Sequence, residues 1–372
     1  MLKTAAPGQK DTICFLSLNG YKLFSPASTA QMGGTELQMH IIATALSRKE
    51  DYHIAYVVGD FGQAKVQHYG SIKVYATFPL TKRIIALVRA PFILFWVLIR
   101  IRPAVIIASP AGPEVGLVGV YCVFSGAKLI FRAASDVDCN GLKARSMTLI
   151  ARFLYTVGIR LSRIIIVQNE KQKKDLRNFY GRESLIIKNG YYLPQPSPFH
   201  AERRAIWIGS SRQVKRPDLF FRLARELPGY QFDMILSHSG DEQLYRWCQQ
   251  RSAEFPNVIF HGELSPEEVN LHLQKSRVLI GTSDYEGAPN TYSMANIYRV
   301  PVVSLHVGCQ GICVQGSIAE MKREICRIMD DDSYHGTISD TAYTYALANN
   351  NIISIIQDWL SAIRQVRYSQ SS

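Results

Sequence analysis

Short apolar segments rich in isoleucine and valine alternate with segments in which apolar residues recur at helical spacing, through most of the chain. Nearly continuous apolar runs separated by helices are typical of parallel strands buried in an α/β sheet. The pattern predicts strands at 13–18, 53–58, 72–75, 104–109, 128–132, 163–168 and 185–188, and in the second half at 205–208, 232–236, 258–260, 278–281 and 302–305.

Helix boundaries are marked most clearly in the second half of the chain. Pro217 is expected in the first turn of a helix, where the missing N–H of proline costs nothing. Ser265 and Glu268 have the spacing of a capping box that opens a helix to about Lys275. A final apolar helix is predicted from about 352 to 363.

The segment 193–200, LPQPSPFH, has three prolines and no periodicity, which indicates a linker. We therefore predict two doubly wound α/β domains, 1–192 and 201–350, followed by a C-terminal helix and tail, 351–372. Ligands of such sheets bind beyond the carboxyl ends of the strands, so two facing domains are expected to share one cleft.

Composition and charge narrow the class of protein. The chain has 372 residues, of which 47% are hydrophobic and 19% charged, and this excludes global disorder. The net charge of +12 is uneven, because residues 1–190 carry 25 Lys and Arg against 11 Asp and Glu (+14), whereas 191–372 carry 17 against 19 (−2). The basic half should face something anionic. Zinc-finger, RNP-like and homeodomain-like patterns are absent from the sequence, so an anionic membrane is a better candidate than nucleic acid. A basic surface with no partner remains open.

Cysteine usage and the N-terminal segment bear on the compartment. The seven cysteines are odd in number and scattered, which suits buried free thiols in a reducing compartment. Cys309 and Cys313 have no second pair, so no zinc site is expected. The first residues lack the long apolar core of a signal peptide. We predict a cytoplasmic protein that is peripheral at the inner face of the membrane.

Two apolar segments support the membrane prediction. Residues 84–101 are almost wholly apolar but contain Arg89 and Pro91 and are short for a spanning helix. A helix buried against the sheet and a helix lying on a bilayer remain equally open. Residues 143–163 combine five cations with apolar residues, as a membrane-surface helix does, although a core-packed helix with a solvated face has the same pattern.

The candidate chemistry is concentrated at residues 286–304, EGAPNTYSMANIYRVPVVS. Pro289, Asn290 and Thr291 suit the first turn of a helix, where small polar side chains cap free N–H groups and the end attracts phosphate. Glu286 lies just ahead and can bond a hydroxyl next to that phosphate. A sugar diphosphate supplies both groups.

A second candidate is the loop WIGSSRQVKRPD, residues 207–218. Arg212 and Lys215 lie in a glycine- and serine-containing loop between a strand and a helix. Arginine offers a planar fork to two oxygens and lysine adds a point charge, so the pair could clamp a diphosphate. Two exposed loop cations without a ligand would have the same sequence.

A third candidate is Gly33-Gly34, which precedes a helix and allows the backbone to approach an anion closely. The chain has no GxGxxG, GxxxxGK[ST], HExxH or GxSxG motif. Dinucleotide-binding, ATPase, zinc-protease and serine-hydrolase interpretations therefore lack support.

Taken in order, GGTE, SRIIIVQNEKQKKDLRNFYGRESLIIKNGYYLP, WIGSSRQVKRPD, NVIFHGELSPEEV and EGAPNTYSMANIYRVPVVS resemble retaining glycosyltransferase family 4, over residues 12–365. The resemblance implies a GT-B fold of two facing Rossmann-like domains, with the C-terminal helix crossing back to the first. It implies that the second domain binds a nucleotide-diphosphate sugar and the first binds a glycan acceptor, with retention and without a metal or other cofactor. The basic first half and the apolar segment 84–101 suggest that this acceptor is lipid-linked, as in cell-surface polysaccharide or lipopolysaccharide synthesis.

The resemblance also assigns roles to residues. Arg212 and Lys215 match the basic pair on the diphosphate, and Glu286 matches the first glutamate of E-x7-E, which contacts the donor sugar. Asn290 and Thr291 match the phosphate-receiving helix start. Further donor contacts are implied for Gly33, Gly34, Leu264, Gly287, Pro289 and Met294.

The chain departs from the family at three places. Met294 replaces the second glutamate of E-x7-E, which usually bonds the ribose, and Arg299 stands where a glycine is usual. An unpaired buried hydroxyl would cost ~1–3 kcal/mol. In place of an N-domain histidine, FRAASDVD offers Ser135, Asp136 and Asp138, and Asp136 is a candidate base or an N-cap.

These departures leave an active glycosyltransferase as the favoured hypothesis, because the cationic pair and Glu286 are present. A non-catalytic subunit of the same fold that regulates a partner enzyme is the alternative, and Arg299 filling the nucleotide site would favour it. A sugar-nucleotide epimerase would need more acid and base residues than these.

Overall fold

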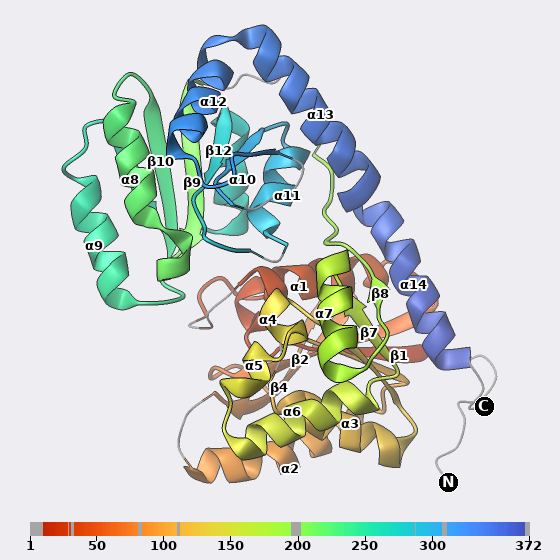
Figure 1. Ribbon diagram of the computed structural model, residues 1–372. Helices are drawn as coiled ribbons and strands as arrows, with labels where there is room; N and C mark the ends of the chain where they lie inside the picture. Colours follow the sequence, from red (N-terminus) through yellow and green to blue (C-terminus); the bar gives the residue numbers. More distant parts are fainter. Residues whose placement is uncertain are drawn as a thin grey trace. The chain divides into compact units, whose positions relative to one another are not determined.

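The computed structural model describes residues 10–28, 30, 33–80, 84–109, 112–194, 202–286, 288–306 and 311–368, with only the backbone of 84–88 and 368. The chain divides into two compact units. The first unit comprises the chain up to Gly190 together with the segment from Ile352 onward, and the second comprises Tyr191–Asn351. Each unit is a sheet with helices on its faces (Figure 1).

The sheet of the first unit has the strand order β3-β4-β2-β1-β5-β6-β7-β8. All neighbouring strands are parallel except β3, which pairs antiparallel with β4. The strands are β1 (Asp11–Leu16), β2 (Tyr52–Asp60), β3 (Val66–Tyr69), β4 (Ile72–Pro79), β5 (Val105–Ala108), β6 (Lys128–Arg132), β7 (Ile164–Val167) and β8 (Leu185–Ile186).

The strand order of the first unit determines which face of the sheet each connecting helix covers. They are α1 (Gly34–Ser47), α2 (Ile84–Ile101), α3 (Glu114–Ser125), α4 (Asp136–Cys139), α5 (Leu142–Arg145), α6 (Leu149–Leu161), α7 (Glu170–Tyr180) and α14 (Ile352–Tyr368), with a short 3-10 helix η1 (Gly20–Leu23). Right-handed crossovers place α2, α3 and α6 on one face of the sheet and α1 on the other. Helix α14 packs against α1, and the Arg367 guanidinium donates to the Asp11 carboxylate at the start of β1 (2.8 Å).

The sheet of the second unit is wholly parallel, in the order β11-β10-β9-β12-β13-β14. Its strands are β9 (Arg204–Ser210), β10 (Gln231–Ser237), β11 (Val258–Gly262), β12 (Val278–Gly281), β13 (Val302–Ser304) and β14 (Ile312–Cys313). Its helices are η2 (Gln213–Lys215), α8 (Pro217–Glu226), α9 (Glu242–Ser252), α10 (Pro266–Lys275), α11 (Asn290–Ile297), α12 (Ile318–Asp330) and α13 (Asp332–Asn350).

The predicted α/β architecture is confirmed, and a strand lies at each of the twelve predicted positions. The apolar pattern missed β3 and β14, because β3 is a half-exposed edge strand of mixed polarity and β14 has only two residues. The capping box is present, since the Ser265 hydroxyl accepts from the Glu268 N–H (3.2 Å) and the Glu268 carboxylate accepts from the Ser265 N–H (2.8 Å). The single helix suggested over 143–163 is wrong, because α5 ends at Arg145 and α6 begins only at Leu149.

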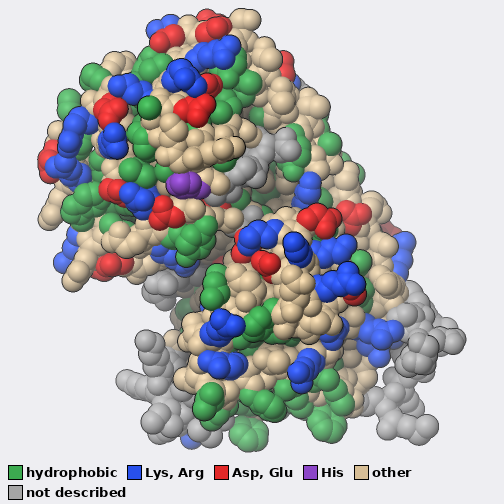
Figure 2. Space-filling view, viewed as in Figure 1, with side chains coloured by type: hydrophobic (Ala, Val, Ile, Leu, Met, Phe, Trp, Pro, Cys, Tyr) green, Lys and Arg blue, Asp and Glu red, His purple; other side chains and the backbone are tan. Residues whose placement is uncertain are grey.

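Helix α2 buries only one of its apolar faces in the first unit. Leu94, Val97 and Leu98 are buried in the core, whereas Phe92 and Trp96 are exposed. Within the described part of the chain, no helix is both long and apolar enough to cross a membrane. Figure 2 shows hydrophobic side chains along the edge of the first unit where Figure 1 draws α2 and α6.

Two glycines allow α3 and α6 to pack closely. A Cβ on Gly116 would lie 2.1 Å from the backbone oxygen of Leu154, and one on Gly158 would lie 2.6 Å from the Gly116 nitrogen. Such contacts are shorter than any atom pair tolerates, so the helix crossing depends on both glycines.

Candidate functional site

The loop that carries Lys215 is fixed to the carboxyl end of β12 by a buried chain of hydrogen bonds. The Trp207 indole donates to the Thr282 hydroxyl (2.8 Å), and this hydroxyl donates to the Lys215 carbonyl (2.7 Å). Trp207 and Thr282 are both buried. The backbone of Lys215 is therefore fixed by the core rather than by solvent-exposed contacts.

Lys215 and Glu286, which are 71 residues apart in the sequence, form an ion pair. The Glu286 oxygen that binds the ammonium also accepts from the hydroxyl of buried Ser283 (2.8 Å). Each of the two charged side chains is only about one-fifth exposed, at 21% and 17%. A lysine ammonium has three donors, so it can bind this carboxylate and an anionic ligand together.

Arg212 takes a different direction from Lys215. It is exposed, and its Nε donates to the Ser239 carbonyl in the loop after β10 (3.3 Å). The next residue after Lys215, Arg216, has a left-handed backbone and pairs with Asp218 and Asp284. The structure thus brings Lys215 to Glu286, while it keeps Arg212 at the loop between β10 and α9.

Helix α11 begins at Asn290, directly after Pro289. The expectation that a small polar side chain caps this end is wrong, because the N-cap is Pro289 and no side-chain cap bond forms. The Asn290 carboxamide oxygen instead accepts from the Tyr191 hydroxyl. Thr291 is half-buried on the first turn, and Gly287 lies outside the described residues.

The residues that depart from the family pattern lie further along α11. Met294 is buried on this helix. Leu264, predicted to contact the donor, is half-buried between β11 and α10. Neither side chain has an oxygen that could replace a carboxylate on a ribose hydroxyl.

Arg299 follows the C-terminal end of α11 and turns toward α13. Its φ of 59° lies in the left-handed region, where glycine is unstrained, and this agrees with the glycine that the predicted resemblance implies at this position. Its guanidinium pairs with Asp340 (2.5 Å) and lies 4.3 Å from the Tyr343 ring centroid. The arginine is therefore engaged by α13 instead of filling the space beside Lys215 and Glu286.

In the first unit, Gly33 is the N-cap of α1, and its N–H donates to the Glu36 carboxylate (2.9 Å). Glu36 is buried, and this burial raises its pKa despite the bonds from the Gly33 and Glu36 N–H groups and the nearby charge of Arg132. Gly34 is the first residue of the helix. The carboxyl end of β1 is thus followed by a loop whose helix start already contains an acid.

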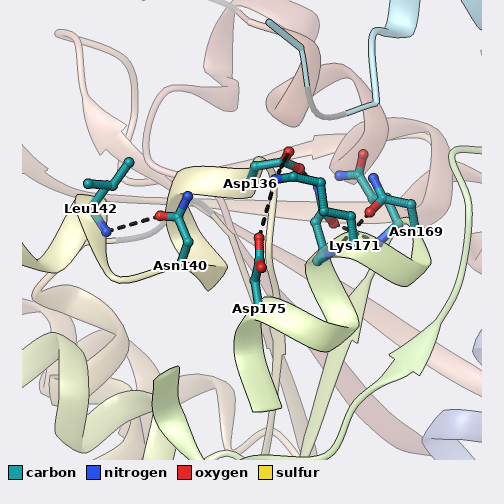
Figure 3. A network of polar contacts seen from close by, with 8 residues as sticks. Asp136, Asn140, Leu142, Asn169, Lys171 and Asp175 are labelled. Atoms are coloured by element: carbon teal, nitrogen blue, oxygen red, sulfur yellow. Dashed lines mark hydrogen bonds and ion pairs between the residues drawn. The ribbon is translucent and has the colours of Figure 1, made fainter. Parts of the chain in front are cut away.

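Asp136 lies at the start of α4, beyond the carboxyl end of β6, and Figure 3 shows it beside Lys171, with Asp175 on the same helix as Lys171. The Lys171 ammonium donates to Asp136 (2.6 Å) and to Asp175 (3.2 Å), and the Gln172 amide donates to Asp136 (3.1 Å). The suggestion that Asp136 is the N-cap is wrong, because Ser135 occupies that position.

The neighbouring Asp138 binds the backbone at the start of α4. Its carboxylate accepts from the N–H groups of Ala134 and Ser135 (2.9 Å each). Burial raises its pKa, although these two bonds act in the other direction. Asp136 is thereby left as the more exposed carboxylate of the pair, at the end of the sheet where ligands bind.

Among the described residues, one group has the composition of a metal site: Asp233, His261 and His272, whose ligand atoms lie within 4.8 Å of one another. The Asp233 carboxylate already accepts two bonds from the Arg204 guanidinium (3.0 and 3.1 Å) and lies 2.6 Å from His261 Nε2. A cation here would have to compete with that guanidinium. The group is accounted for as a network of polar contacts around the buried Asp233 carboxylate.

Comparison with known proteins tests the predicted resemblance. The family model described as glycosyl transferases group 1 matches residues 202–331, most of the second unit. The second unit is therefore similar to group 1 glycosyltransferases over these residues. The predicted resemblance is therefore confirmed, and the chain is a glycosyltransferase with the GT-B fold. A search of curated protein sequences finds no match to the chain.

Solved structures share the fold over nearly the whole chain. Sucrose-phosphate synthase from Thermosynechococcus elongatus has a TM-score of 0.75 at 15% identity, over 97% of this chain and 100% of that one. WaaG, a glycosyltransferase involved in lipopolysaccharide biosynthesis, has a TM-score of 0.64 at 13% identity, over 96% and 100%. A TarM variant from S. aureus, in complex with UDP and other ligands, has a TM-score of 0.60 at 16% identity, over 74% of this chain and 59% of its own.

Some residues that shape the site were not predicted from the sequence. Thr282 and Ser283 position Lys215 and Glu286, and Glu36 and Lys171 surround the first-unit candidates. The signal for Thr282 and Ser283 was their place directly after a buried strand, where parallel sheets bind ligands. The signal for Glu36 was its place three residues after Gly33, the spacing at which a carboxylate in the first turn can accept from the N–H of the N-cap residue.

Proposed function

We propose that this glycosyltransferase moves a sugar from a nucleotide-diphosphate sugar to a lipid-linked glycan, with retention of anomeric configuration and without a metal. The observation that carries the donor assignment is the ion pair of Lys215 with Glu286 beside the start of α11. A cation next to a carboxylate suits a ligand that has phosphate and hydroxyl groups side by side.

The charge arrangement supports a leaving diphosphate. When the bond from the sugar C1 to the diphosphate oxygen breaks, negative charge grows on that oxygen, and a fixed ammonium stabilises it more than it stabilises the ground state. Lys215 is fixed in this way by Thr282 and Ser283 through its carbonyl and its partner carboxylate. The TarM variant of the same fold is in complex with UDP, which agrees with a nucleotide donor.

Retention fits a site with few acids and bases beside the donor. In the proposed mechanism the acceptor oxygen attacks C1 on the face that the diphosphate leaves, and the acceptor proton passes to the departing diphosphate oxygen. Glu286 then orients a sugar hydroxyl, and Lys215 neutralises the diphosphate. Arg212 joins Lys215 on the diphosphate when its guanidinium leaves the Ser239 carbonyl. A dedicated protein base is not needed for this proton transfer.

The acceptor is assigned to the first unit. Asp136, at the carboxyl end of the sheet, has a carboxylate that can bind a sugar hydroxyl while Lys171 and Gln172 fix its orientation. A lipid-linked acceptor agrees with the net charge of +14 over residues 1–190 and with the role of WaaG in lipopolysaccharide biosynthesis. We accordingly place the protein at the cytoplasmic face of the membrane, as a peripheral protein.

The alternative is a non-catalytic subunit, and Met294 is the observation that favours it. A buried methionine at that position can pack against a ribose but cannot accept its hydroxyl hydrogen bonds as a carboxylate does. The engagement of the Arg299 guanidinium by Asp340 and Tyr343 of α13 weighs against this alternative, since the arginine is held there by partners of its own.

A binding panel tests the proposal directly. UDP, GDP and their common sugar conjugates are titrated by calorimetry, with and without a chelator, into the wild type and the Lys215→Ala variant. We expect micromolar binding of one nucleotide that withstands the chelator and is lost in the variant. The anomeric configuration of the product, followed by NMR, then tests retention. Absence of binding across the panel would support the non-catalytic subunit.

A further inference from the structure

Three helices of the first unit present large apolar side chains to solvent. We define the apolar face as Phe92, Trp96 and Ile99 on α2, Phe124 on α3, and Ile150 and Phe153 on α6. These six side chains are between 56% and 80% exposed. Single exposed apolar residues are common, but a cluster of aromatic residues on adjacent helices marks a binding surface.

The helix periodicity shows that this exposure is not a packing accident. Residues 92, 96 and 99 follow the i, i+4, i+7 spacing of one helix face, while Leu94 and Leu98 face the core. The same helices therefore have two apolar faces, and only one is covered. Helix α3 packs against both α2 and α6, so their exposed faces belong to one side of the unit.

Cations accompany the apolar face, and acids are almost absent from it. Between residues 81 and 169 the sequence has 12 Lys and Arg but only three acids, Glu114, Asp136 and Asp138, which gives 12 − 3 = +9. Arg89, Arg100 and Arg160 are exposed on α2 and α6, and Arg100 lies 4.7 Å from the Trp96 ring centroid. Helices α2 and α6 contain no acid.

We propose that the apolar face inserts into the interfacial layer of an anionic lipid bilayer. This deepens the proposed function, on which it rests, by assigning the membrane contact to particular side chains. Aromatic residues with arginines alongside suit the boundary between headgroups and acyl chains. A second copy of the chain is disfavoured as the occupant, because two such faces would bring like charges together.

Insertion of the apolar side chains and electrostatic attraction of the cations contribute separately to membrane binding. Attraction of the cations to anionic headgroups weakens when salt screens the charges, whereas burial of apolar side chains does not. A protein that is only attracted should leave the vesicles at high salt. A protein that also inserts should remain partly bound.

Vesicle co-sedimentation tests the proposal on the full-length chain, with vesicles of equal parts phosphatidylcholine and phosphatidylglycerol. A triple variant, Phe92→Ser, Ile150→Ser and Phe153→Ser, is expected to bind at least about tenfold more weakly and to lose the salt-resistant part. The control is Leu271→Ser, which removes a comparably exposed apolar side chain (56%) from α10 of the second unit. It should bind like the wild type.

A fluorescence measurement avoids dependence on the triple variant. Of the four tryptophans, Trp207 and Trp359 are buried, so Trp247→Phe leaves Trp96 as the exposed one. Brominated lipids should quench Trp96 on binding, because insertion brings the indole into contact with the acyl chains. Binding without quenching would contradict insertion.

The remaining outcomes are distinguishable. Vesicle binding that disappears entirely in high salt, or that the triple variant retains, would overturn the proposal. Concentration-dependent self-association without vesicle binding would overturn it in favour of a second copy. Nucleotide titration of the same variants separates this from the donor assignment, since the apolar face lies in the first unit and Lys215 in the second.

Discussion

The first unit is built on the same kind of parallel sheet as the second, yet the two present opposite surfaces. Residues 1–190 carry +14 and expose aromatic side chains on α2, α3 and α6, whereas 191–372 carry −2 and have their cations largely in ion pairs. The difference shows that a doubly wound sheet constrains its core and the carboxyl ends of its strands, while the outer faces of its helices are free to specialise.

The carboxylates of the two units differ in a related way. In the first unit, burial raises the pKa of Glu36 and Asp138. In the second unit, hydrogen bonds from Arg216 and Arg222 lower the pKa of Asp218 and Glu226. These two acids of the first unit are thus desolvated, whereas these two acids of the second unit are paired with arginines at the surface. The contribution of the two pairs of acids to the stability of the fold should therefore change with pH in opposite directions.

The largest expected effect is a loss of turnover on mutation of the second unit, which would show that this unit stabilises the transition state. Lys215→Ala should lower turnover at least tenfold, because the ammonium beside Glu286 no longer stabilises the departing diphosphate. Steady-state kinetics with the nucleotide sugar identified by titration provide the measurement. Arg222→Ala on α8 is the matched control, since Arg222 is exposed and pairs with Glu226 on the same helix. Unchanged kinetics in Lys215→Ala would refute the assignment.

A smaller effect concerns helix packing, and it compares a glycine from each unit. Gly158→Ala should destabilise the protein by about 1–3 kcal/mol, because its Cβ would collide with the α3 backbone. Gly336→Ala on α13 should instead stabilise by about 0.5–1 kcal/mol, since nothing lies within 4 Å and alanine favours the helix. Thermal unfolding of both variants decides, and equal shifts would show that α3 and α6 can separate at little cost.

The smallest effect is the pH dependence. The raised pKa of Asp138 contributes stability that is present below the unfolded value of about 3.9 and is lost as pH rises through the folded pKa. The lowered pKa of Asp218 contributes stability that is present above the unfolded value and is lost as pH falls through the folded pKa.

The difference in Tm between the wild type and Asp138→Asn should therefore fall as pH rises, and that between the wild type and Asp218→Asn should rise. Asp218 is half-exposed, so its effect is the weaker of the two. Calorimetry at a series of pH values measures both Tm differences. If the two differences change with pH in the same direction, the proposed contrast between the units is wrong.

The sequence predicted the fold well because the core strands are continuous apolar runs, and such runs fit only a sheet covered on both faces. It also located the loops of Lys215 and Glu286. It did not predict that Arg212 would turn to Ser239, that Pro289 would replace Asn290 as the cap, or that Arg299 would bind Asp340. Each of these depends on a partner from a different element, which periodicity cannot identify.

The sequence by itself determined the order of strands and helices, the uneven charge and the family motifs, because these depend on residues close together in the chain. Only the tertiary structure decided which of the apolar residues in 84–101 are buried and which form the apolar face, since an almost wholly apolar helix has no continuous polar side to mark its solvent face. It also decided that Lys215 meets Glu286 across 71 residues, through the Trp207 and Thr282 hydrogen bonds that fix the loop.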